Sequence, residues 1–212
     1  MKKKTLVPFI VFLLGICLIS FIVYKTNAHE EEQKHTTAQL NATTYGERIK
    51  NEITNGIEIT DVLKQILISE DGELNQFDTV AIMSDSIESI QLAPNGVVTD
   101  IYPAEGNEAG KIDLLHDKDR QEISCYARDN HTLITQCPFE LKQGGYGLAV
   151  RNPVYLKDDN GQEYFWGFTI VILRVPDIFS DSISALSDFG YEYKLSKTVA
   201  PWDNTYEVVY QS

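Results

Sequence analysis

The chain has 212 residues, and its 18 Lys and Arg against 31 Asp and Glu give a net charge of −13 at pH 7. Without the three N-terminal lysines, Lys2–Lys4, the count is 15 basic against 31 acidic side chains, a net charge of −16. Such an acidic surface repels phosphate backbones, which argues against nucleic-acid binding. Apolar residues make up 43% of the chain, enough for a packed core, and three cysteines are too few for a disulfide-stapled mini-protein or a zinc ribbon.

The N-terminal segment predicts export. Residues 5–24 carry no charge and, as a helix, would span about 30 Å, the thickness of the hydrocarbon core of a bilayer. The preceding lysines should stay in the cytoplasm, so the chain after Tyr24 is expected outside the membrane. A cleaved signal peptide is the alternative, although the cleavage-like triplet Thr26–Ala28 fits poorly, and a lipoprotein signal would need a small residue where Ile16 precedes Cys17.

A long helix is predicted after a charged stalk over residues 29–36. From 37 to 69 the apolar positions recur at helical spacing, and Asp71-Gly72 is a stop signal. The stripe consists of Leu40, Ile49, Ile53, Ile57, Thr60, Leu63, Ile66 and Leu67. The helix either packs on its own domain or pairs with a second subunit and runs on from the membrane segment. Its part from Ile49 to Ile57 precedes the globular domain, which predicts a homodimer contact there.

The next segments predict a short helix over 76–86 and a hairpin of strands over 87–92 and 97–102. The turn Ala93-Pro94-Asn95-Gly96 between alternating apolar runs is typical of a hairpin. Asp119 and Glu122 have the spacing of a capping box for a helix over 120–128.

Further strands and one helix follow. The strands are predicted over 132–136, 139–141, 147–155, 163–173, 191–195 and 206–210, and the helix from Pro176 to about Leu186. Since hairpins join most strands, we expect an α+β fold with a PAS-like antiparallel sheet, preceded by a long N-terminal helix continuous with a membrane anchor. The expected domains are 1–24, the flank and anchor; 25–75, the stalk and helix; 76–176, the ligand-binding domain; and 177–212, the start of a second half.

The ordered motifs over Ser89–Leu115 (SIQLAPNGVVTDIYPAEGNEAGKIDLL) and Cys137–Tyr155 (CPFELKQGGYGLAVRNPVY) resemble the CHASE family, the extracytoplasmic sensory domain of receptor kinases and cyclases. The resemblance covers residues 77–176. It implies a PAS-like domain that binds a small ligand outside the membrane and feeds a cytoplasmic histidine kinase or diguanylate cyclase, in cis or in trans. The family fold also has a membrane-proximal second half, which the residues from Tyr191 onward would begin.

The same resemblance implies ligand contacts at Asp113 and Arg151. In plant cytokinin receptors the position of Asp113 accepts a hydrogen bond from the ligand, whereas the position of Arg151 carries Thr, which argues against a cytokinin. An arginine suits a carboxylate or another anion, and the pair together suits a zwitterion. The structural alternatives are that Asp113 braces its loop and that Arg151 pairs with Asp113.

Other candidates carry weaker signals. Tyr102 and Tyr155 are expected to line the ligand pocket, although aromatic residues at strand spacing are more often core. His116 and the aspartates around it match no closed metal site, so no metal and no cofactor are expected. No local nucleophile motif is present, so the chain is not expected to be an enzyme. In the oxidising exterior Cys125 and Cys137 are candidates for a disulfide, with two free buried thiols as the alternative.

Two functions follow from these observations. The first is a ligand-sensing input module of a membrane receptor, which signals through a dimeric helix. The alternative is a standalone membrane-anchored binding or adaptor protein with no output of its own.

Overall fold

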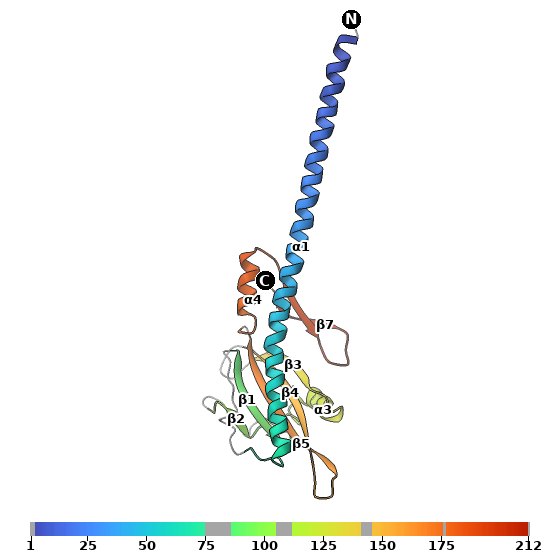
Figure 1. Cartoon of the computed structure of the whole chain (residues 1–212). Coiled ribbons are helices and arrows are strands. Elements are labelled where there is room, and N and C mark those ends of the chain that lie inside the picture. The colour runs from blue at the N-terminus through green and yellow to red at the C-terminus, as the bar shows by residue number, and fades with distance from the viewer. Residues whose placement is uncertain (1–2, 75–85, 105–111, 141–145, 176, 212) are drawn as a thin grey trace. The chain divides into compact units, whose positions relative to one another are not determined.

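The computed structural model describes residues 3–74, 86–104, 112–140, 146–175 and 177–211 (Figure 1). The chain divides into two compact units, Met1–Gly46 and Glu47–Ser212. Nearly all of the short helix predicted over 76–86 lies outside the described residues.

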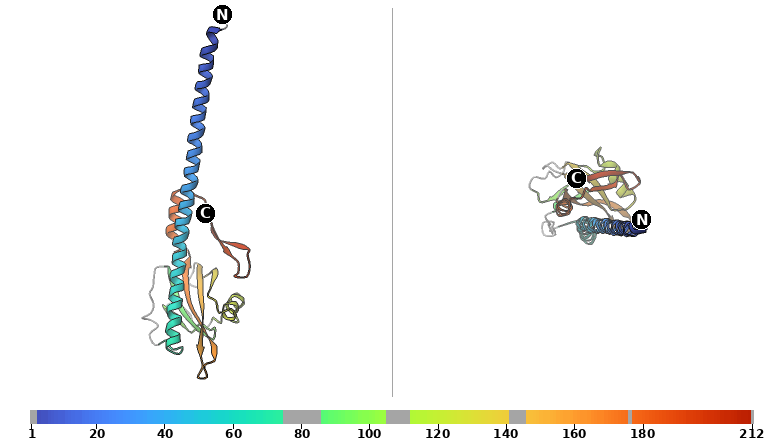
Figure 2. Two further views of the ribbon diagram at one scale, coloured as in Figure 1. Left: turned by 45° about the vertical axis from the view of Figure 1, so that its right-hand side comes forward. Right: turned by 90° about the horizontal axis from the view of Figure 1, so that it is seen from above.

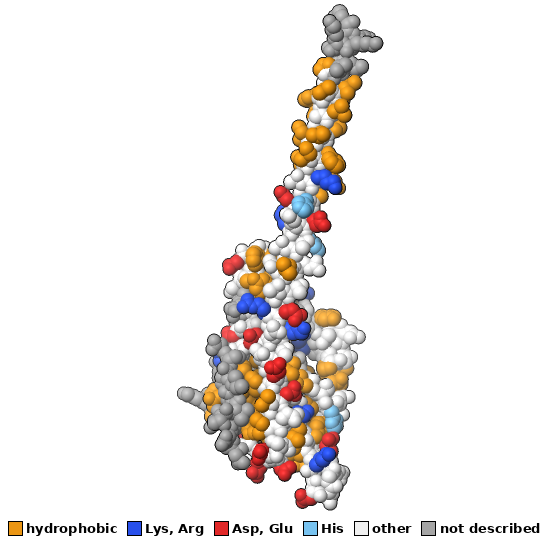
Figure 3. Space-filling model, in the orientation of Figure 1, with side chains coloured by type: hydrophobic (Ala, Val, Ile, Leu, Met, Phe, Trp, Pro, Cys, Tyr) orange, Lys and Arg blue, Asp and Glu red, His pale blue; other side chains and the backbone are white. Residues whose placement is uncertain are grey.

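One helix, α1, runs from Lys3 to Ser69 over 67 residues. In the first unit its apolar side chains from Phe9 to Tyr24 are exposed, and they gather on the N-terminal part of the helix in Figure 3. The described part of this helix, from Pro8, is long and apolar enough to cross a membrane. A signal sequence near the N-terminus has the same properties, so the segment could be an anchor or a signal.

The second unit is built on a five-stranded antiparallel sheet with the order β2-β1-β5-β4-β3. The strands are β1 Ile87–Pro94, β2 Asp100–Tyr102, β3 Ile134–Glu140, β4 Tyr146–Lys157 and β5 Glu163–Val175. The predicted α+β architecture, a long helix followed by an antiparallel sheet, is confirmed. Where two strands were predicted, β3 is a single strand whose register shifts between Gln136 and Phe139. The intervening Pro138 has no N–H for the ladder, which explains both the shift and the prediction.

Strand alternation divides the core between two faces of the sheet. On the α1 face, Leu148 and Val150 of β4 belong to a cluster with Leu63 of α1. On the opposite face, which we call the α3 face, Ala149 belongs to a cluster with Ala127 of α3 (Gln121–Asp129). Figures 1 and 2 show α1 along one side of the sheet and α3 on the other.

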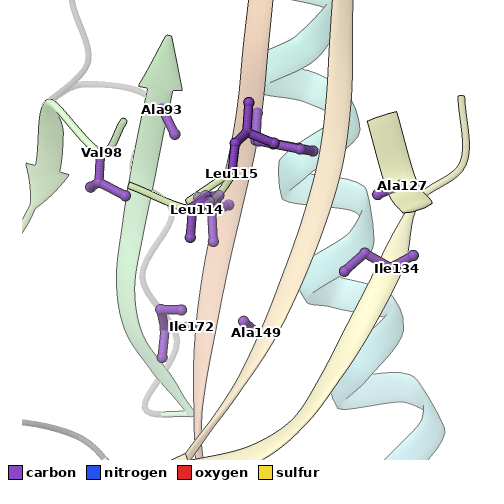
Figure 4. Close-up of a cluster of buried hydrophobic side chains, with 10 residues drawn as sticks. Ala93, Val98, Leu114, Leu115, Ala127, Ile134, Ala149 and Ile172 are labelled. Atoms are coloured by element: carbon purple, nitrogen blue, oxygen red, sulfur yellow. The ribbon is translucent and has the colours of Figure 1, made fainter. Parts of the chain in front are cut away.

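The segment Ile112–Leu115 closes part of the α3 face. Leu114 and Leu115 are buried over the sheet together with Ala93 and Val98 (Figure 4). Gly96, in the predicted hairpin turn, is required there for two reasons. Its φ is +85°, and a Cβ on it would lie 2.6 Å from Cγ of Leu115. The turn therefore admits the leucine that covers the sheet.

The second half of α1 packs on its own domain. Ile49, Ile53 and Ile57 are partly buried against the cluster on the α1 face. The stripe from Ile49 to Ile57, expected to precede the globular domain, is instead partly covered by it, because β1, β4, β5 and the segment after β5 supply apolar partners. Ile178 and Phe179 belong to that same cluster.

The C-terminal part contains α4 (Ser180–Asp188) and an antiparallel hairpin of β6 (Lys194–Thr198) and β7 (Tyr206–Gln211). Between these two strands, Trp202 contacts Tyr126 of α3, with the ring centroids 4.6 Å apart. This contact joins the C-terminal hairpin to the helix that covers the α3 face.

Candidate functional site

Arg151 is the buried charge that defines the candidate site. It lies on β4 between Ile134 of β3 and Ile170 of β5, both of which belong to the cluster on the α3 face. Its exposed fraction is 2%. Its Nε and Nη1 atoms have no hydrogen-bond partner in the described part of the chain. Removing a guanidinium from water without giving it a hydrogen-bond or ion-pair partner lowers the stability of the fold.

The charges around Arg151 do not neutralise it. Burial, reinforced by the like charge of Arg120, lowers the pKa of Arg151 to about 9, and the carboxylate of Asp117 offsets only part of this effect. Asp117 is already paired with Arg120, whose Nη1 lies 2.8 Å from Oδ2. Arg120 also lies over the ring of Phe139, 5.6 Å from its centroid. The site therefore keeps excess positive charge.

Two further polar atoms on this face have no partner among the described residues. They are Oγ of Ser124, on the buried side of α3, and Oε1 of Gln136 on β3. Sequence analysis missed both residues. A serine on the side of a short helix where apolar residues are expected was the available signal for Ser124. No comparable signal marks Gln136.

Asp113 has a structural role in its loop. Its Oδ1 accepts hydrogen bonds from the backbone N–H of Leu115 at 3.1 Å and of His116 at 3.2 Å, and its Oδ2 lies 2.9 Å from Nδ1 of His116. This is the loop-bracing arrangement that the sequence analysis left open. No ion pair joins Asp113 to Arg151 in the described residues, although both belong to segments on the α3 face.

The aspartates that follow also hold the loop together. Oδ1 of Asp117 accepts a bond from the backbone N–H of Asp119 at 3.0 Å. The predicted capping box is wrong, because α3 begins after Arg120 and no side chain caps it. In the described residues no group of three or more His, Cys, Asp or Glu is arranged to hold a metal ion.

The two predicted tyrosines lie on different faces. Tyr102 pairs with Ile90, a member of the cluster on the α1 face, so alternation places Tyr102 away from Arg151. Tyr155 donates its hydroxyl to the backbone carbonyl of Arg128, at the end of α3, and its ring stacks on His131 with the centroids 3.9 Å apart. Tyr155 therefore fastens α3 to the sheet.

The predicted disulfide is not formed in the structure. Cys125 is a free cysteine, and its side chain packs against the cluster on the α3 face. It serves there as a small apolar residue. The side chain of Cys137 lies outside the described ones.

Comparison with known proteins identifies the second unit. Residues 70–202, more than half of the chain, match the model of the CHASE domain. Among solved structures, an extracellular ligand binding receptor from Desulfohalobium retbaense DSM5692 is similar in fold, with a TM-score of 0.53 and 15% sequence identity. The match covers 68% of this chain and 26% of that receptor, so this chain spans about a quarter of the receptor's length. No curated protein sequence matches the chain.

Proposed function

Because this chain belongs to the CHASE domain family, we propose that it is the ligand-sensing input module of a membrane receptor, with the ligand bound on the α3 face of the sheet. CHASE is a sensory, non-catalytic domain that binds ligands outside the cell. Membership of the family does not by itself place the ligand on the α3 face. That assignment rests on Arg151.

The buried guanidinium of Arg151 is the single observation that carries the proposal. A fully buried arginine that lacks hydrogen-bond partners destabilises a fold unless something else offsets its desolvation. Two of its nitrogens have no partner in the described residues, and it lies on the face of the sheet that α3 and the leucine segment cover. A ligand that accepts hydrogen bonds from Arg151 would supply the missing partner.

A route from this site to α1 passes through the next residue of β4. The side chain of Asn152 lies on the α1 face, where its Nδ2 donates to Oδ1 of Asp61 at 2.6 Å and its Oδ1 accepts from Nζ of Lys64 at 3.2 Å. A shift of β4 on ligand binding would move these polar contacts and with them the end of α1. Ligand and signal are coupled only if the ligand binds two arrangements of the domain with unequal affinity.

The sensory unit would be anchored in the membrane, form a homodimer and pass its signal to an output protein. The apolar segment of α1 would act as an uncleaved anchor that holds the sensory unit outside the cell, and a homodimer would bring two α1 helices together. Because Ile49 and Ile53 are partly buried on their own domain, we expect exposed residues of the helix to contribute to the dimer contact. The output would be a cytoplasmic histidine kinase or diguanylate cyclase, in cis or in trans.

The test of the sensor function is ligand-induced stabilisation of the full chain, purified in detergent and screened by thermal unfolding against neutral, cationic and anionic small molecules. We expect at least one saturable shift in Tm, which Arg151→Met abolishes. Arg174→Met is the matched control, because Arg174 is half exposed and already paired with Glu88 and Asp177. Binding that survives Arg151→Met would contradict the proposed face.

Transmission and anchoring have separate tests. Hydrogen exchange of the amides over 57–69 should change when the ligand binds, and Asn152→Ala should remove that change. N-terminal sequencing of the membrane fraction should find an intact first segment, and a mature chain beginning near His29 would contradict the anchor. The DNA downstream of codon 212 separates a receptor from an adaptor.

A further inference from the structure

The α3 face carries the buried positive charge of Arg151, and two carboxylates of the loop before α3 are already engaged. The carboxylate of Asp113 is engaged by Leu115 and His116, and that of Asp117 by Arg120 and Asp119. No carboxylate in the described residues lies within ion-pair distance of Arg151. A bound anion of charge −1 would neutralise this site, whereas a zwitterion would add an ammonium group for which neither Asp113 nor Asp117 is free as a counter-charge.

Two buried oxygen atoms accompany the guanidinium. Gln136 pairs with Ala149 and stands diagonally across from Arg151, which pairs with Ile134, so both long side chains project from the same face within reach of one small molecule. The Nε2 of Gln136 donates to the carbonyl of Asp119 at 3.4 Å, which leaves Oε1 as an acceptor close to the start of α3. Ser124, one turn further along α3, is fully buried with its hydroxyl unpartnered in the described residues.

We propose that the ligand of this site is a small monocarboxylate that also carries a neutral hydrogen-bond donor, such as an α-hydroxy acid. Its carboxylate binds the fork of Arg151, and its hydroxyl donates to Oε1 of Gln136, with Oγ of Ser124 as a further contact. The inference rests on the proposed sensor function and names its ligand class. It replaces the zwitterion expected from the sequence, because Asp113 is committed to its loop.

Geometry and charge favour a carboxylate over a phosphate. A planar guanidinium binds a carboxylate through two parallel hydrogen bonds, and the charge balance is then one to one. A phosphate dianion would need a second cation, and the neighbouring Arg120 is already paired with Asp117.

The test compares matched probes on the full chain in detergent, by thermal unfolding and calorimetry. For several side-chain lengths the probes are an α-hydroxy acid, the α-keto acid, the α-amino acid and the α-hydroxy amide, beginning with lactate, pyruvate, alanine and lactamide; inorganic phosphate is added as a separate probe. We expect the hydroxy acids to bind most tightly, and keto acids about tenfold more weakly because Gln136 then has no donor to accept. Amides and amino acids should give no saturable shift.

Two variants assign the contacts. Arg151→Met should weaken binding of the best hydroxy acid by about 30-fold or more, while Arg174→Met leaves it unchanged. Gln136→Met should bring the affinities for the hydroxy acid and the keto acid close together. The ligand-free melting temperature of Arg151→Met should be equal to or above that of the parent chain, since the substitution removes an unpaired buried charge.

Each contrary result overturns the inference. A lower ligand-free melting temperature for Arg151→Met would mean that the guanidinium has a partner within the protein. Tightest binding by an amino acid or by phosphate, or no shift with any carboxylate, would exclude the ligand class. In that last case a neutral or cationic compound that stabilises the parent chain would leave the sensor function standing, and the absence of any stabilising compound would remove both.

Discussion

Arg151 and Asn152 are consecutive residues of β4, yet their buried side chains serve opposite faces of the sheet. The guanidinium of Arg151 faces the side covered by α3 and lacks hydrogen-bond partners at two of its nitrogens in the described residues. The amide of Asn152 makes hydrogen bonds on the other side, to Asp61 and Lys64 of α1. β4 thus connects a buried guanidinium that lacks hydrogen-bond partners in the described residues with a hydrogen-bonded contact to α1.

Replacement of Asn152 by Leu should lower the free energy of unfolding by about 1–3 kcal/mol. Asp61 loses its donor and Lys64 loses its acceptor, while the number and branching of the side-chain heavy atoms are kept. Denaturant unfolding of the full chain in detergent measures the change. Asn160→Leu, in the exposed turn between β4 and β5, is the control and should fall within about 0.5 kcal/mol of the parent chain. An equal loss in both variants would contradict a specific role for Asn152.

Replacement of Arg151 by Met should raise the stability of the ligand-free protein by about 1 kcal/mol or more. Met keeps an unbranched apolar stem, while the buried charge, which has no ion-pair partner in the described residues, disappears. Arg174→Met should have the opposite sign, because it breaks the pairing with Glu88. Thermal and denaturant unfolding of the three proteins measure both signs, and a destabilised Arg151→Met would show that the charge is compensated internally.

Asp113 should contribute to stability in a pH-dependent manner. Desolvation acts against its ionisation, but the hydrogen bonds from His116 and from the backbone of Leu115 outweigh it and hold the pKa of Asp113 below its usual value. A depressed folded-state pKa gives stability that is present above the unfolded pKa of about 3.9 and is lost as pH falls through the folded value. Asp113→Asn should therefore be less stable than the parent chain near neutral pH and match it at low pH.

The control for Asp113 is Asp119→Asn in the same loop, whose carboxylate makes no hydrogen bond with the described residues. Its stability near neutral pH should therefore stay within about 0.5 kcal/mol of the parent chain. The measurement is denaturant unfolding of all three proteins across the acid range. A difference between Asp113→Asn and the parent chain that is constant with pH would contradict the role of the charge.

Replacement of Ile53 by Asp should destabilise the domain rather than release a folded monomer. Ile53 packs against the cluster on the α1 face, so the substitution places a carboxylate at a partly buried apolar position and costs about 2 kcal/mol or more. Val62→Asp is the control, because Val62 on the same helix is 52% exposed. Unfolding and sedimentation together separate loss of stability from loss of association.

Tyr126 and Trp202 should stabilise the docking of the C-terminal hairpin on α3. A double-mutant cycle with Tyr126→Ala and Trp202→Ala is expected to give a coupling energy of about 0.5–1.5 kcal/mol, the range for an aromatic pair. Trp166→Ala with Tyr126→Ala is the control cycle, since Trp166 packs against the other face of the sheet, beside Leu67 of α1. A coupling energy near zero for the first cycle would contradict the contact.

Local patterns in the sequence predicted much of the fold. Alternation of apolar residues indicated four of the five sheet strands within a few residues of their bounds, and the Pro-Asn-Gly turn identified the first hairpin. The ordered motifs also identified the CHASE family. These features depend on neighbours in the chain, so the sequence contains them directly. The predicted capping box at Asp119 was wrong because two local patterns competed: the side chain of Asp117 accepts the backbone N–H of Asp119, and α3 begins only after Arg120.

Only the tertiary structure decided how the candidate residues are used. The sequence by itself determined that Asp113 and Arg151 are polar residues in a family-like position, that an acidic domain follows an apolar helix, and that Ile49–Ile57 form an apolar stripe. Folding committed Asp113 to its own loop, covered part of that stripe with the domain, and left Arg151 buried on the face that also holds Ser124 and Gln136. The physical reason is that burial and hydrogen bonding depend on contacts between segments far apart in the chain. Which donors and acceptors of a residue stay unpartnered is therefore known only once its neighbours in space are known.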